Sequence, residues 1–212
     1  MIGLDVARQC AEDFEASHKV QILEPEEARK YLSILEASLS LIPGVPGVVN
    51  AIKSLAGDRM RNVSLTIPTP GPTLILLSEY AVSQGDIYLS TLAHELVHKV
   101  QIKVNGALQA GIDYVDPNWR SLREAEAGGV GLWVRYVVTN VLPAPTEAGV
   151  TSSDLYHLDE DHKKFGRVIV NSALSTSMTG ATPPHSIAIE MLAWLRKHAP
   201  DVIKVPSYLN PS

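Results

Sequence analysis

Two histidines and a glutamate stand together in the segment His94-Glu95-Leu96-Val97-His98. Residues four positions apart lie on the same face of an α-helix, so the imidazoles of His94 and His98 can converge on one metal ion. Glu95 lies to the side of this pair, where its carboxylate can reach a metal-bound water rather than the metal. The segment therefore predicts a zinc site with its own general base.

The residues around this segment are largely apolar, which predicts a buried helix. They are Leu92, Ala93, Leu96, Val97 and Val100. A glutamate in such a setting needs a partner or a function, because burying a charge costs free energy. We therefore interpret the segment as a metal site rather than as two surface histidines on an amphipathic helix.

A catalytic zinc usually has three protein ligands and a water, so a third side chain is needed. Residues 123 to 128 supply two candidates, Glu124 and Glu126, on a helix expected over residues 117 to 139. The two glutamates cannot both serve, because positions i and i+2 point to different faces of a helix. Small residues there would let this helix pack closely against the histidine helix; they are Ala125, Ala127, Gly128, Gly129 and Gly131.

The histidine motif followed by a glutamate-bearing helix resembles the gluzincin class of metallopeptidases. The string Glu124-Ala125-Glu126-Ala127 is similar to the E-x-E-A-D form found in several of its families. The resemblance covers about residues 73 to 135 and implies Glu124 as the third ligand, with Glu126 as the alternative. Those families usually have an aspartate where this chain has Gly128, so a partner for a ligand histidine must come from elsewhere.

Other ligand layouts fit less well. The three-histidine layout needs glycine and histidine where this chain has Gln101 and Val104, so that class is excluded. Gln101 instead extends the motif to HExxHxxQ, a form found in bacterial and phage families. Asp113 and Asp116 are weaker candidates for the third ligand, since Asp116 is better explained as a helix cap.

The resemblance implies a zinc-dependent hydrolase, most simply a metallopeptidase with one Zn²⁺ per chain and a protein or peptide substrate. Glu95 would accept a proton from zinc-activated water and pass it to the leaving amine. An oxyanion donor is expected beyond the third ligand. The candidates are Tyr156 and His157, followed by His162 and His185. Residues 73 to 78 would form either the edge strand that receives an extended peptide or a core strand.

Two other functions fit the same residues. One is a structural or binding protein that keeps a gluzincin core, with the metal holding the fold. The other is a zinc amidase that acts on a cell-wall bond. An intact Glu95 favours an enzyme, because a purely structural site needs no base.

The elements that must position these residues are mostly helices. Helices are expected over residues 4 to 17, 25 to 40, 48 to 56, 87 to 104, 117 to 139, 160 to 174 and 185 to 198, and strands over 63 to 67 and 73 to 78. We expect Asp86 to cap the histidine helix and Asn105-Gly106 to end it.

The predicted fold class is α+β, mostly helical. It is a minimal zincin core with a small antiparallel or mixed sheet, in which the HExxH helix packs on the Glu-bearing helix. We expect one domain over residues 1 to 212. It divides into an N-terminal helical portion (1 to 57), a metal-site core (58 to 140) and a C-terminal helical portion (141 to 212).

Composition narrows the partners and the setting. The 212 residues are 45% hydrophobic and 19% charged, which is typical of a globular chain. A net charge of −5 without a basic patch argues against nucleic acid as a partner. The single cysteine, Cys10, excludes an intrachain disulfide and is expected to be partly buried. Without a signal peptide or a membrane-spanning stretch, we expect a cytoplasmic protein or one released by another route.

Overall fold

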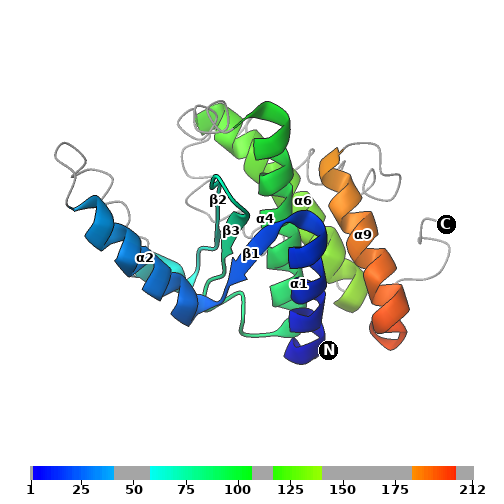
Figure 1. Ribbon diagram of the computed structural model, residues 1–212. Coiled ribbons are helices and arrows are strands. Elements are labelled where there is room, and N and C mark those ends of the chain that lie inside the picture. The colour runs from blue at the N-terminus through cyan, green and yellow to red at the C-terminus, as the bar shows by residue number, and fades with distance from the viewer. Residues whose placement is uncertain (1, 41–57, 107–116, 140–182, 204–212) are drawn as a thin grey trace.

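The computed structural model describes residues 2–40, 58–106, 117–139 and 183–203 (Figure 1). This part is mostly helical with a small mixed sheet, as predicted for the α+β class. Its elements are α1 (Leu4–His18), β1 (Val20–Leu23), α2 (Pro25–Leu39), η1 (Asp58–Arg61), β2 (Leu65–Ile67), β3 (Thr73–Leu76), α4 (Gly85–Asn105), α6 (Pro117–Thr139), α9 (Pro183–His198) and η3 (Pro200–Val202). The helices expected over residues 48 to 56 and 160 to 174 lie outside the described residues.

The three strands form one sheet in the order β1-β3-β2. β1 runs parallel to β3, with Val20 opposite Thr73, and β2 runs antiparallel to β3, with Leu65 opposite Leu76. The sequence predicted β2 and β3 but not β1, because four residues between two helices are too few to show a period. β3 is therefore the central strand, paired on both sides.

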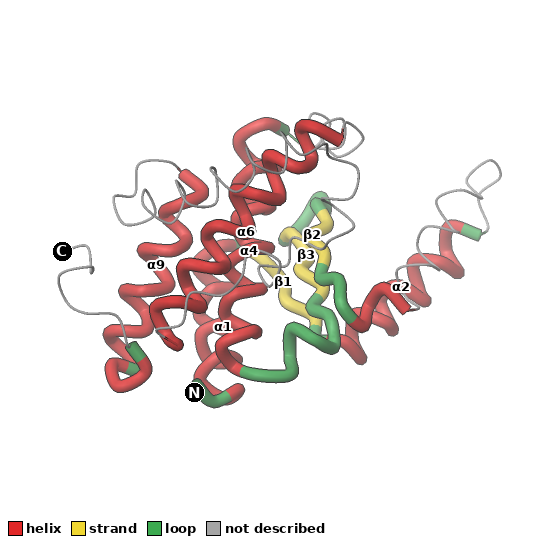
Figure 2. The backbone as a smooth tube through the Cα atoms, turned by 180° about the vertical axis from the view of Figure 1, so that it is seen from behind, coloured by secondary structure: helices red, strands yellow, loops and turns green. Residues whose placement is uncertain are grey.

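Alternate residues of the β3 segment enter two different hydrophobic cores, because successive side chains of a strand point to opposite faces. Ile75 and Leu77 belong to the larger core, and Leu74 and Leu76 belong to the smaller one. The smaller core also contains Leu23, Ala28, Leu32 and Met60 and lies under α2. Figure 2 shows α2 projecting away from the bundle formed by the other long helices.

The larger core lies among α1, α4, α6 and α9, and α4 contacts the other three helices. Leu89, Leu92 and Leu96 of α4 are completely buried. A helix that is buried on several faces is the centre of its domain rather than a surface helix. The side chains of α4 before its last turn are therefore held in place by packing against three helices. The division of the chain into three portions stays a prediction.

The start of α4 differs from the prediction. The helix begins at Gly85, with Gln84 at the N-cap and no side-chain cap, so the assignment of Asp86 as the cap was wrong. Asp86 lies in the first turn, where a carboxylate favours the helix dipole, and it accepts a hydrogen bond from Nε of Arg135 at 3.2 Å. The side chain of Asp86 therefore pairs with Arg135 of α6 and does not cap α4. The predicted end at Asn105 and Gly106 is confirmed.

The close packing predicted for the two long helices is confirmed at one glycine. A Cβ added to Gly131 of α6 would lie 2.8 Å from the backbone oxygen of Ser90 and 3.6 Å from Cβ of His94 on α4. Any larger residue at position 131 would press on the backbone of α4. The clash could be removed only by moving a helix, because the nearest atom is not part of a flexible side chain. Gly131 therefore sets the distance between α6 and α4 at the turn that carries His94.

None of the helices within the described ranges is long and apolar enough to cross a membrane.

Gly131→Ala should destabilise the fold, because its methyl group would press on the backbone of Ser90. Overpacking of this kind costs about 1 to 3 kcal/mol of unfolding free energy. The measurement is urea unfolding of the metal-free chain. Gly71→Ala is the control, since its Cβ would meet only Thr69 at 3.8 Å. Equal stability of the two variants would contradict the close approach.

Cys10 should be inert in the folded chain. It is completely buried in α1, and this burial raises the pKa of its thiol. Because the thiolate is the reactive form, a thiol reagent should modify Cys10 only after unfolding. Ellman's reagent in buffer and in guanidinium measures this directly. Rapid reaction of the native chain would show that α1 does not pack as described.

Candidate metal centre

Two histidines from α4 and one glutamate from α6 meet in the interior. The Nε2 atoms of His94 and His98 are 2.9 Å apart. Oε2 of Glu124 lies 3.2 Å from Nε2 of His94 and 3.4 Å from Nε2 of His98. The three residues are only 7%, 4% and 8% exposed. The structure thus brings together the three side chains that the sequence singled out as ligands.

The size of this triangle fits a small metal ion. Zinc bonds of about 2.0 to 2.2 Å in a tetrahedron place ligand atoms about 3.3 to 3.6 Å apart. The separation of 3.4 Å lies within this range and that of 3.2 Å just below it, whereas the two imidazole nitrogens, at 2.9 Å, would have to move apart slightly to hold an ion. Two imidazole nitrogens and a carboxylate oxygen, all within 4.8 Å of one another, form a group that could bind a metal ion.

The three side chains are coupled electrostatically. Burial disfavours the charged form of His98. The charge and hydrogen bond of Glu124 outweigh this effect and raise the pKa of His98 to about 9. Burial likewise opposes ionisation of Glu124, yet His98 and His94 hold the pKa of its carboxyl well below the usual value. A buried carboxylate between two imidazoles therefore needs a positive charge beside it.

Glu126 points to a different neighbour. Its Oε2 accepts a hydrogen bond of 2.8 Å from Nε2 of Gln101, whereas Oε1 of Gln101 lies 2.9 Å from Nδ1 of His98. Gln101 thus supplies the hydrogen-bond partner for a candidate ligand histidine, which Gly128 has no side chain to supply. From the sequence, Gln101 was noted only as part of the longer HExxHxxQ motif. Among the described residues, Nδ1 of His94 has no hydrogen-bond partner.

Glu95 lies beside the cluster and not in it. Its side chain is 4% exposed, and its Oε2 accepts a hydrogen bond of 2.7 Å from Oγ1 of Thr66 on β2. Thr66 was not predicted as part of the site. No sequence signal could have found it, because its contact with Glu95 depends on how the sheet packs against α4.

The strand that lies beside Glu95 also differs from the prediction. Residues 73 to 78 were considered as an edge for a peptide, which was wrong, because β3 is paired with β1 and with β2. The alternative prediction for residues 73 to 78, a core strand, fits the buried residues of β3. Within the described part, β2 has a strand on one side only, and it contacts α4.

Several candidate residues remain outside this description. Tyr156, His157, His162, Asp113 and Asp116 lie outside the described residues, and His185 lies in the first turn of α9. The oxyanion donor therefore stays a prediction.

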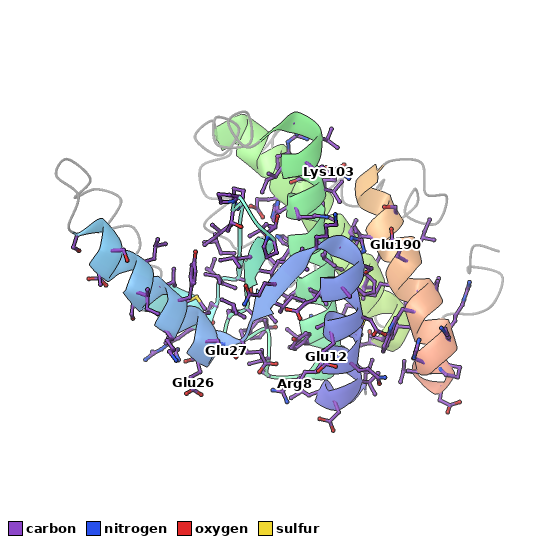
Figure 3. All side chains as sticks on the ribbon, in the orientation of Figure 1. Arg8, Glu12, Glu26, Glu27, Lys103 and Glu190 are labelled. Atoms are coloured by element: carbon purple, nitrogen blue, oxygen red, sulfur yellow. The ribbon has the colours of Figure 1, made fainter. Side chains whose placement is uncertain are left out.

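Many other charged groups of the helices lie on the outside. Figure 3 shows Glu12 on α1 and Glu26 and Glu27 on α2, and all three are exposed. Glu124, by contrast, is buried between two imidazoles.

No protein-family model, no curated protein and no solved structure matches the chain. The resemblance to gluzincins therefore rests on the motif residues alone.

Replacing Glu124 should decide which glutamate belongs to the cluster. We expect His94→Ala, His98→Ala and Glu124→Ala each to abolish zinc retention, because each removes one of three converging donors. Glu126→Gln should keep about one zinc per chain at saturating zinc, since its carboxylate contacts Gln101. Metal content after dialysis measures this, with exposed Glu12→Ala as a further control. Retention of zinc by Glu124→Ala together with its loss in Glu126→Gln would reverse the assignment.

Proposed function

We propose that the chain is a zinc-dependent hydrolase, most simply a metallopeptidase, with one Zn²⁺ held by His94, His98 and Glu124. The observation that carries this proposal is the position of Glu95. It adjoins a cluster of three donors without joining it. Structural zinc sites use four protein ligands, whereas catalytic sites use three and leave one position open.

The donor set supports zinc in particular. Imidazole suits zinc, copper, iron and nickel, and carboxylate oxygen is a common third zinc ligand. No sulfur ligand is available, because the only cysteine is Cys10, which is buried in α1. When bound, Zn²⁺ would lower the pKa of a coordinated water and polarise the carbonyl of a substrate.

Glu95 would then transfer the proton of the activated water. Glu95 is the acceptor, and the hydroxyl of Thr66 holds one of its carboxylate oxygens, so the other oxygen is available to a water at the cluster. Glu95 would pass that proton to the leaving group. Burial of the site keeps bulk water away and strengthens the electrostatic interactions within it.

The edge of β2 supports a peptide substrate. An extended peptide can add to a strand whose outer edge is unpaired, through main-chain hydrogen bonds that select little for sequence. Because Thr66 of β2 also holds Glu95, a peptide on this edge would lie beside the general base.

One observation favours the alternative of a metal-stabilised binding protein. The three residues of the cluster and Glu95 are each no more than 8% exposed. A metal in such a place could serve the fold alone.

Glu95→Gln separates these two functions. It should keep the zinc content and reduce hydrolysis of a denatured protein by about 10² to 10⁴-fold, because the amide cannot accept the proton. The measurements are metal content and release of labelled peptides by the zinc-loaded chain, with Glu12→Gln at an exposed position of α1 as the matched control. Full activity of Glu95→Gln would refute the mechanism. A zinc-loaded wild type that melts higher but hydrolyses nothing would favour the binding protein.

A further inference from the structure

We propose that Gln101 is a positioning residue that fixes which nitrogen of His98 faces the metal, using an anchor on α6. The inference rests on the proposed zinc site. Gln101 lies on α4 close to one turn after His98 and is 5% exposed. All the polar atoms of its side chain have partners within hydrogen-bond distance.

The orientation of the Gln101 amide follows from its partners on α6. Its Nε2 lies 3.1 Å from the backbone oxygen of Arg123 and 2.8 Å from Oε2 of Glu126. A carbonyl and a carboxylate oxygen can only accept, so the NH₂ group must face α6. The amide oxygen of Gln101 must then face His98.

The tautomer of His98 follows from that orientation. An amide oxygen can only accept, so Nδ1 of His98, at 2.9 Å, must carry the proton that it donates to Gln101. In the neutral imidazole, Nε2 is then the atom with the free lone pair. This is the nitrogen that lies 3.4 Å from Oε2 of Glu124 and 2.9 Å from Nε2 of His94.

The charge of Glu126 acts through the same chain of hydrogen bonds. A carboxylate that accepts from the amide NH₂ polarises the amide, and its oxygen becomes a better acceptor for Nδ1 of His98. Such partners orient a ligand histidine and raise its basicity. These hydrogen bonds can raise the basicity of His98 through Gln101, so the carboxylate of Glu126 need not contact the imidazole itself.

Gln101 also joins the two helices that carry the ligands. Its bond to the backbone of Arg123 holds the residue directly before Glu124. His94 differs from His98 here, because among the described residues its Nδ1 has no partner and its Cβ lies where Gly131 packs closely. Among the described residues, only His98 has a hydrogen-bond partner on the ring nitrogen that faces away from the cluster.

The test compares three substitutions in the full-length chain by chelator competition for zinc. Gln101→Leu removes the acceptor and the donors at similar size, and we expect about 10 to 100-fold weaker zinc binding. Glu126→Gln keeps an acceptor and removes the charge, so a smaller loss is expected. Gln21→Leu makes the same exchange at an exposed position of β1 and should leave the affinity unchanged.

A spectroscopic measurement tests the tautomer without any variant. In ¹⁵N-labelled, zinc-loaded wild type, His98 should show a proton on Nδ1 that exchanges slowly and a metal-bound Nε2. Gln101→Leu should speed that exchange. A metal-bound Nδ1 in the wild type would overturn the proposal even if the variants failed to fold.

The outcomes separate the two proposals. If the wild type binds no zinc, the proposed function fails and this inference fails with it. If the wild type binds zinc and folded Gln101→Leu binds it within twofold, only the role of Gln101 is overturned. A loss in Gln101→Leu with a retained Nδ1 proton in the wild type supports it.

Discussion

The burial of one carboxylate between two imidazoles is the constraint on which the rest of the molecule depends. An ionised Glu124 in the interior is costly unless a positive charge lies beside it, because burial removes most of its contact with solvent. The backbone contact at Gly131 brings α6 close enough to α4 for the carboxylate to reach both histidines. Glu124 raises the pKa of His98, which favours a proton on this imidazole when no ion is bound, and a divalent ion could supply the positive charge instead.

The site divides its tasks between elements of different kinds. The three donors stand on two long helices packed against each other, which suits positions that must not vary. The orientation of Glu95 comes instead from the short strand β2, through Thr66. Whatever shifts β2 therefore shifts the proposed base without moving the donors. In a site built this way, the proposed base could move while the three candidate ligands stay in place.

The sequence predicted the parts of the site that depend on local spacing. His94 and His98 follow from the helical repeat, and the long helices were found because their patterns extend over many residues. Contacts that depend on packing were not predictable. Thr66 reaches Glu95 only because of the position of β2, and the hydrogen bond from Gln101 to Glu126 depends on the rotation of α6 about α4. The position of Asp86, which pairs with Arg135 of α6 and does not cap α4, likewise depends on packing between helices.

The two cores on either side of β3 give the fold an uneven resistance to opening. Helix α2 covers the face that carries Leu74 and Leu76, while the bundle covers the face that carries Ile75 and Leu77. Detachment of α2 alone would uncover a strip of apolar sheet and leave every hydrogen bond of the metal centre in place. A form of the chain with α2 detached would therefore expose apolar surface while the three candidate ligands stay together.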